Sequence, residues 1–148
     1  MANLIAISES NDHNIPSSLK RHSLRSMPSD AITLWGTGTP RREFLHVDDV
    51  ASACVFIIKL DDSTFNNSTE PILSHINVGA GKDLTISELS ETIKKVVGYN
   101  GEVTWNQTKP DGTPKKLLDA SKLNSLGWKP EISLTEGIKK TYNEYLKK

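Results

Sequence analysis

The sequence predicts a small α/β domain of mixed topology. Short runs rich in β-branched and aromatic residues, at 32–35, 72–78 and 102–105, alternate with longer stretches whose apolar residues recur at helical spacing. Two of the helical stretches begin with a Ser/Thr-x-x-Glu capping signature, at 85–88 and 133–136. The predicted order is helix, strand, strand, helix, strand, helix, strand, helix, helix. This set of elements is too small for a complete doubly wound sheet.

Length and charge narrow the class of protein. A chain of 148 residues suits one domain with a hydrophobic core. Its 18 Lys and Arg residues balance 18 Asp and Glu residues, so we expect neither nucleic acid nor a membrane surface as a partner. We expect no transmembrane span, because no apolar run approaches about 18 residues, and no signal peptide, because no charged-then-apolar leader is present. The single cysteine, Cys54, suits a reducing, cytoplasmic location, and its apolar neighbours predict a buried thiol.

The first 30 residues divide into two parts. Residues 1–10 show no pattern, whereas the polar residues 11–14 precede Pro16 as helix caps, and the helix is expected to reach about residue 27. Residues 28–30 then stop it. By residue type alone, His13 is a solvated residue at a helix start and Arg21 is one more charge on a solvated helix face.

Most of the specific chemistry lies in residues 35–49. A strand ending at Trp35 runs into residues 36–40, which must turn because they hold two glycines and a proline. Arg41 and Arg42 follow, before a short apolar strand predicted at 44–47. Guanidinium groups and an indole beside a tight turn suit an anionic ligand that carries a sugar. The residue types alone favour a plainer interpretation, an edge hairpin whose arginines pair with the nearby carboxylates of Glu43, Asp48 or Asp49.

The middle of the chain predicts two helices around a strand. Residues 50–59 are apolar nearly all round, which predicts a buried helix capped by Asp48 or Asp49 rather than a metal or acid/base pair. No metal site is predicted. Residues 61–71 are expected to form a polar loop, and the strand at 72–78 ends in a glycine turn. The capping box at 85–88 opens a helix that ends at Gly98.

The last third of the chain contains a second candidate site loop. After the strand at 102–105, two prolines fix the loop at 109–114, so it can present Asp111 to a ligand at low entropic cost. Alternatively, Asp111 bonds only its own backbone in an Asx-turn. A short helix at 121–125, with Asp119 as its cap, precedes the final helix, which begins after Ser133.

Three strings of residues carry a resemblance to a known family. They are GTPRREFLHVDD at 38–49, HINVGAG at 75–81, and KPDGTPKKLLD at 109–119 followed by LGW at 126–128. Together they resemble the nucleotide-sugar-binding region of the extended short-chain dehydrogenase/reductases, and within these the GDP-L-fucose synthases. The first string marks only the broad superfamily, and a UDP-sugar 4-epimerase also fits it. The KPDGTP string is more specific and fits such an epimerase less well.

The resemblance implies a domain division and a set of site residues. It covers residues 11–148, so we expect residues 1–10 to be an unmatched leader and residues 11–148 a C-terminal nucleotide-sugar-binding domain. His13 matches the family histidine that lies beside the nicotinamide and acts as general acid in epimerisation. It would therefore be a catalytic and a cofactor-binding residue. The residues implied to bind substrate are Arg21, Trp35, Arg42 and Asp111.

The implied reaction converts GDP-4-keto-6-deoxy-D-mannose to GDP-L-fucose by epimerisation at C3 and C5 and NADPH-dependent reduction at C4. The sequence contains neither a Gly-x-x-Gly-x-x-Gly string nor a Tyr-x-x-x-Lys pair. We therefore expect a substrate-binding part that lacks the N-terminal Rossmann core, which would bind most of the NADP, and that is inactive alone. The alternative is a non-catalytic nucleotide-sugar-binding or structural fragment. The sequence gives no basis for an oligomeric state.

Overall fold

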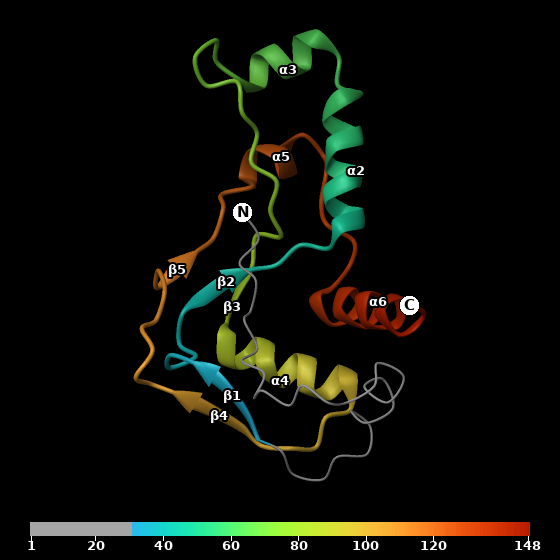
Figure 1. Ribbon diagram of the computed structural model, residues 1–148. Coiled ribbons are helices and arrows are strands. Elements are labelled where there is room, and N and C mark those ends of the chain that lie inside the picture. Colours follow the sequence, from blue (N-terminus) through green and yellow to red (C-terminus); the bar gives the residue numbers. More distant parts are fainter. Residues whose placement is uncertain (1–30) are drawn as a thin grey trace.

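The computed structural model describes residues 31–148, which form an elongated arrangement with α3 at one end and β1 and β4 at the other (Figure 1). The elements in chain order are β1 (Ile32–Trp35), β2 (Arg41–Glu43), α2 (Val47–Ile58), α3 (Asp62–Ser68), β3 (Asp83–Thr85), α4 (Ile86–Val97), β4 (Val103–Asn106), β5 (Lys115–Lys116), α5 (Ser121–Ser125) and α6 (Leu134–Leu146).

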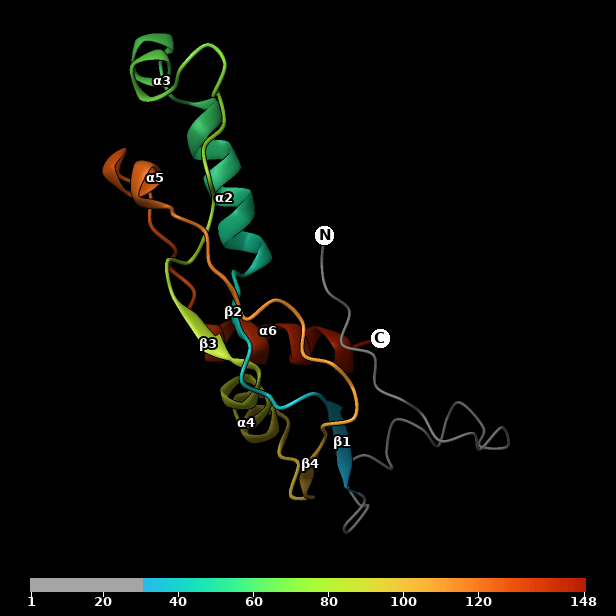
Figure 2. The same ribbon diagram turned by 90° about the vertical axis from the view of Figure 1, so that its left-hand side faces the viewer.

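The strands form two small sheets. β1 pairs with β4 in parallel, and β2 lies between an antiparallel β3 and a parallel β5. In β1, alternate residues face opposite sides: Ile32 and Leu34 are half-buried and line an apolar groove shared with α4, whereas Thr33 and Trp35 are exposed. Figures 1 and 2 both show the β1–β4 pair beside α4. The exposed face of β1 therefore presents Trp35 to solvent at the end of the strand.

A small core joins α2 to the segment that follows β5. Ala53 and Leu123 are fully buried beside Trp128, and partly buried apolar residues surround them: Leu45, Phe56, Ile57, Ile76 and Val78. The indole N–H of Trp128 donates a hydrogen bond of 3.0 Å to Ser52 Oγ on α2. The core thus fixes α2 from one side only.

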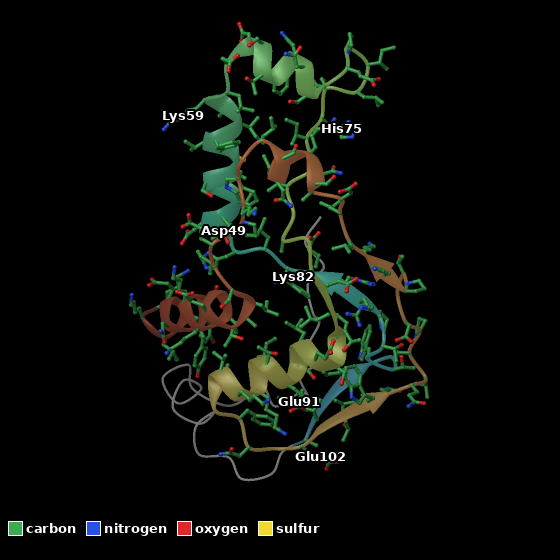
Figure 3. All side chains as sticks on the ribbon, turned by 180° about the vertical axis from the view of Figure 1, so that it is seen from behind. Asp49, Lys59, His75, Lys82, Glu91 and Glu102 are labelled. Atoms are coloured by element: carbon green, nitrogen blue, oxygen red, sulfur yellow. The ribbon has the colours of Figure 1, made fainter. Side chains whose placement is uncertain are left out.

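The start of α2 differs from the prediction that an aspartate caps it. His46 is the N-cap, and its Nδ1 accepts a hydrogen bond from the Asp48 backbone N–H. Asp49 is instead buried, 3% exposed, and its carboxylate oxygens accept hydrogen bonds from the backbone N–H groups of Glu131 and Ile132 at 3.2 and 3.0 Å. The helix begins at Val47, so Asp49 lies inside its first turn and reaches the segment that leads into α6 (Figure 3).

The prediction that α2 is a buried helix, with Cys54 inside, is wrong for this chain. Cys54 is exposed and Ile58 is 81% exposed. Both belong to a continuous apolar stripe of exposed residues along the helix, which consists of Val47, Val50, Ala51, Cys54, Val55 and Ile58. The sequence pattern correctly showed a helix that is apolar all round, but within residues 31–148 nothing covers this second apolar face.

Helices with strong local signals form as predicted. In α4, Thr85 Oγ1 accepts from the Glu88 N–H at 3.1 Å, Glu88 Oε2 accepts from the Thr85 N–H at 2.7 Å, and Gly98 closes the helix at φ 71°. The Thr85 N–H and hydroxyl lower the pKa of Glu88. The contact between them therefore stabilises the fold fully above the ordinary pKa of a glutamate, and this stabilisation is lost as the pH falls through the lowered pKa. In α6, Ser133 is the N-cap as predicted.

Other predicted elements shift or change type. The strand predicted at 44–47 lies earlier, at Arg41–Glu43, and the polar loop at 61–71 contains the helix α3, whose N-cap is Asp61. The run at 72–78 forms no strand within residues 31–148, where its only β-contact is an isolated bridge between Glu70 and Leu73. The strands β3 and β5 were not predicted, because pairing with β2 creates these two- and three-residue strands rather than any local apolar pattern.

Candidate functional site

Arg41 belongs to the scaffold rather than to an open site. Its Nε lies 2.9 Å from Asp83 Oδ1, and Lys115 Nζ approaches the other carboxylate oxygen at 3.3 Å. The hydrogen bond from Arg41 and the neighbouring Lys115 lower the pKa of Asp83. Arg41 thus pairs with a carboxylate 42 positions away, and not with Glu43, Asp48 or Asp49 as the edge-hairpin interpretation required.

Glu43 is also used inside the fold. Its Oε1 accepts a hydrogen bond of 2.6 Å from the Gly81 N–H, and its Oε2 accepts one of 3.1 Å from the Leu118 N–H. A Cβ placed on Gly79 would lie 2.7 Å from Glu43 Oε1, so the backbone of residues 79–81 packs directly on this carboxylate. Glu43 therefore ties two distant loops to β2.

Arg42 is the cation of this motif that stays available. Its Nη1 donates to the backbone oxygen of Arg41 at 2.7 Å, and among residues 31–148 no carboxylate lies within ion-pair distance of its guanidinium. Lys116 is opposite Arg42 in the parallel β2–β5 register, so both side chains lie on one face of the sheet. That face carries positive charge without an internal counter-ion, which suits an anion.

The loop at 109–114, here called the proline loop, contacts the turn at 36–40, here called the glycine turn. Asp111 Oδ1 accepts from the Thr37 N–H at 2.8 Å, and its Oδ2 accepts from the Thr37 hydroxyl at 2.6 Å. These two hydrogen bonds lower the pKa of Asp111, which stays a carboxylate at neutral pH. Asp111 therefore bonds a distant loop and not its own backbone, so the Asx-turn alternative does not apply.

The proline loop also brings the predicted site residues together. Lys109 Nζ lies 5.3 Å from the centre of the Trp35 ring, a cation–π distance, and Trp35 is 53% exposed. A Cβ placed on Gly112 would lie 3.1 Å from Arg42 Nη2. Trp35 and Arg42 thus border the proline loop, and Asp111 belongs to it. The other two predicted site residues, His13 and Arg21, lie outside the residues that the structure describes.

The glycine turn needs its glycines for packing. Gly36 and Gly38 have φ of 80° and 76°, and a Cβ on Gly38 would lie 2.6 Å from the Trp105 ring. Sequence reasoning identified the turn but missed Thr37, Thr39 and Lys109 as members of the site. The available signal was a pair of hydroxyl residues alternating with the two glycines.

The described glycines do not fit a dinucleotide cradle. Such a cradle needs a glycine loop that opens directly into a helix, with its backbone free to approach a pyrophosphate. The glycine turn instead joins β1 to β2, and Gly79 packs on Glu43 ahead of the strand β3. Residues 31–148 also contain no cluster of three or more residues suited to a metal ion and no helix able to cross a membrane.

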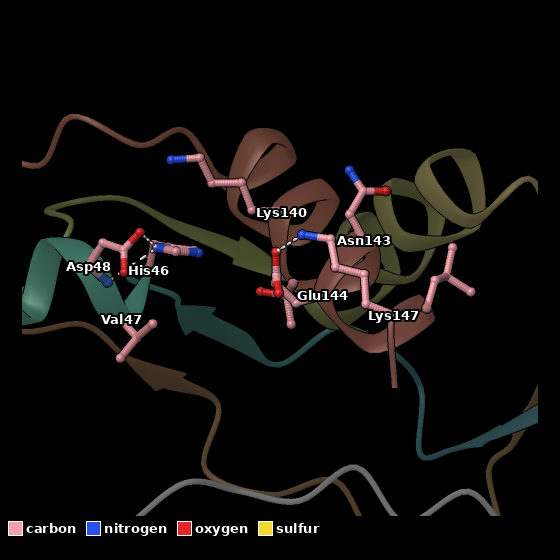
Figure 4. Close-up of a pocket in the computed structure, with 9 residues that line it drawn as sticks. His46, Val47, Asp48, Lys140, Asn143, Glu144 and Lys147 are labelled. Carbon is pink, nitrogen blue, oxygen red and sulfur yellow. Dashed lines mark hydrogen bonds and ion pairs between the residues drawn. The ribbon is translucent and has the colours of Figure 1, made fainter.

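A separate pocket lies between the start of α2 and the end of α6 (Figure 4). It has a volume of about 890 Å³, and neither Trp35, Arg42 nor Asp111 lines it. Two of its charged residues, Glu144 and Lys147, already form an ion pair with each other. The pocket is therefore distinct from the candidate site and less suited to an anion.

Comparisons with known proteins agree on one family. Residues 2–79 match the NAD dependent epimerase/dehydratase family. The chain is 51% identical over 138 residues to a GDP-L-fucose synthase of Escherichia coli K12, covering 93% of this chain and 43% of that protein. It is 47% identical over 138 residues to GDP-L-fucose synthase 1 of Arabidopsis thaliana, covering 93% of this chain and 40% of that protein. The chain thus spans about two fifths of the length of these curated relatives.

The fold is also similar to that of a solved structure. The fold resembles a GDP-D-glycero-L-gluco-heptose synthase from Campylobacter jejuni, determined in the presence of NADPH, with a TM-score of 0.69 and 38% identity. The likeness covers 78% of this chain and 33% of that one. The mixed α/β arrangement predicted from the sequence is therefore confirmed as one that the family uses.

Proposed function

The chain belongs to the NAD dependent epimerase/dehydratase family, and we propose that it is the nucleotide-sugar-binding part of a GDP-L-fucose synthase. One observation carries the proposal: the guanidinium of Arg42 has no carboxylate partner among residues 31–148, and it lies beside the proline loop that Trp35 also borders. Of the charged side chains on β2, Arg41 and Glu43 serve the scaffold. Arg42 is left to bind an anion.

In the proposed complex Arg42 binds the diphosphate, because its planar fork of donors matches two phosphate oxygens. Trp35 offers an exposed ring face near the base or sugar, and the family resemblance assigns Arg21 to the phosphate groups. Asp111 completes the set at the edge of the proline loop. The proposed ligand is a GDP-sugar: GDP-L-fucose, after which the relatives are named, or its precursor GDP-4-keto-6-deoxy-D-mannose, which the family resemblance implies.

The complete reaction, epimerisation at C3 and C5 followed by NADPH-dependent reduction at C4, would need a second polypeptide part. That part would bind NADP, with His13 of this chain beside the nicotinamide as general acid. Two findings support this division: the relatives are more than twice as long as the matched region, and Gly36, Gly38 and Gly79 in the two glycine-containing turns pack against side chains. The exposed apolar stripe on α2 is the surface on which the Rossmann half would pack.

The partner proposal predicts the outcome of an NADPH-oxidation assay with GDP-4-keto-6-deoxy-D-mannose. The chain alone should give no turnover, because it lacks half of the cleft that orients the reactants. Mixing it with the remaining, N-terminal portion of the E. coli relative should restore activity. Replacing Ile58 in the stripe with Glu should abolish that rescue, whereas Lys122→Glu on α5 should not. Turnover by the chain alone would contradict the proposal.

The second candidate function is nucleotide-sugar binding without catalysis. It differs in one outcome, because a non-catalytic protein would bind the GDP-sugar but would gain no activity from the Rossmann portion of a relative. A UDP-sugar epimerase part is less favoured, since the two curated relatives named above are GDP-L-fucose synthases. Preference for GDP or UDP separates these two substrate classes.

A further inference from the structure

We propose that Asp111 is a positioning residue that orients a chain of two hydroxyl groups, so that Thr39 presents a hydrogen-bond acceptor to a hydroxyl group of the ligand. The inference rests on the proposed nucleotide-sugar site and assigns a contact within it. It also changes the role expected for Asp111, which would act through Thr37 and Thr39 rather than by direct contact.

The first step is that each oxygen of Asp111 accepts one hydrogen bond from Thr37. The Thr37 N–H reaches Oδ1 at 2.8 Å and the Thr37 hydroxyl reaches Oδ2 at 2.6 Å, across a sequence separation of 74 residues. An ionised carboxylate only accepts hydrogen bonds, so the Thr37 hydroxyl must donate its single proton to Asp111. The lowered pKa of Asp111 agrees with this direction.

The second step fixes the proton of Thr39. The two hydroxyl oxygens of Thr37 and Thr39 are 2.7 Å apart, a hydrogen bond in which geometry alone allows either to donate. Because the Thr37 proton already points to Asp111, Thr39 must be the donor. The Thr39 oxygen then has no proton left and offers only lone pairs to its surroundings.

The Thr39 oxygen lies on the turn that precedes β2. Thr39 is exposed on the glycine turn, between Gly38 and the strand that carries Arg42. The Thr39 backbone N–H also points at Thr37 Oγ1, at 3.3 Å, which restricts the turn further. An acceptor-only oxygen three positions before Arg42, the cation proposed to bind phosphate, suits a hydroxyl group of the same ligand, on either the ribose or the hexose. GDP carries the first alone, and GDP-mannose carries both.

Isosteric variants test the direction of the hydroxyl chain. Thr39→Ser keeps the oxygen and should bind GDP-mannose within about twofold of the wild type, whereas Thr39→Val should lose about 3- to 10-fold in affinity. Asp111→Asn should lose a similar factor, because its amide N–H₂ can donate to Thr37 and reverse both hydroxyl groups. An equal loss with GDP would assign the ligand hydroxyl to the ribose, and a loss with GDP-mannose only would assign it to the hexose.

The double variant separates positioning from direct contact. If Asp111 acts through Thr39, Asp111→Asn should add little to Thr39→Val. Two independent losses that add in the double variant would overturn the proposal, because they would mean that Asp111 contacts the ligand itself.

The pKa of Asp111, measured without ligand, tests the hydroxyl chain independently of the proposed function. Carbon-13 NMR of the Asp111 carboxyl should show a lowered pKa in the wild type and in Thr37→Ser, and a smaller lowering in Thr37→Val, where the backbone N–H still donates to Oδ1 but the hydroxyl group is gone. An unchanged titration in Thr37→Val would overturn the hydroxyl chain even if GDP binds. If neither GDP nor GDP-mannose binds the wild type, the proposed function fails, and with it the ligand contact of Thr39, whereas the titration still decides the hydroxyl chain.

Discussion

Replacing Arg42 with alanine is expected to weaken GDP binding by about 10- to 100-fold, measured by titration calorimetry. The guanidinium has no carboxylate partner among residues 31–148, so its charge-assisted hydrogen bonds are available to the diphosphate. Such bonds are worth roughly 1.5–3 kcal/mol each, and 1.4 kcal/mol corresponds to a tenfold change in affinity. The fold of residues 31–148 should be unaffected, because among them the side chain of Arg42 donates a hydrogen bond only to its neighbour's backbone oxygen.

Two control variants make this result specific. Arg42→Lys keeps the charge but loses the fork of donors, so its affinity should lie between those of the wild type and Arg42→Ala. Lys59→Ala removes a cation from the far end of α2 and should leave GDP binding unchanged (Figure 3). The account of Arg42 is contradicted if Arg42→Ala binds GDP as tightly as Lys59→Ala does.

Replacing Asp49 with alanine is expected to lower the free energy of unfolding by about 2–4 kcal/mol, measured by urea denaturation. The carboxylate is 3% exposed and accepts from two backbone N–H groups, on Glu131 and Ile132. Its removal leaves those donors without partners and separates α2 from the segment that enters α6. Asp49→Asn keeps an acceptor and should lose less stability.

The matched control is the neighbouring carboxylate. Asp48 has a side chain that is 66% exposed and near His46, so Asp48→Ala should change the free energy of unfolding by less than about 1 kcal/mol. Equal losses for Asp48→Ala and Asp49→Ala would contradict the assignment of Asp49 as a buried tie between helices.

Elements with strong local signals were predictable from the sequence. The helix α4 has a capping box and a closing glycine within its own residues, and β1 and β4 are short β-branched runs beside turns. The strands β3 and β5 exist only because β2 pairs with them, so no local pattern shows them. The apolar run at 72–78 has a strand pattern but finds no partner strand within residues 31–148.

The candidate site was predictable in outline. The tight turn, the unusual density of arginines and the proline-fixed loop were visible in the sequence, and they led to Trp35, Arg42 and Asp111. The sequence could not show which arginine remains free, because Arg41 pairs with Asp83 across 42 positions. Thr37 and Thr39 were missed for the same physical reason, since a contact across 74 positions depends on the fold.

The most direct test of the proposed nucleotide-sugar site is calorimetric titration of the purified chain with GDP and, separately, with UDP. The account predicts binding that is selective for GDP, because the proposed ligand is a GDP-sugar, whereas the diphosphate that Arg42 would hold is common to both nucleotides. Equal affinity for GDP and UDP would contradict the substrate class. A folded chain that binds neither nucleotide would contradict the claim that residues 31–148 contain a working nucleotide site.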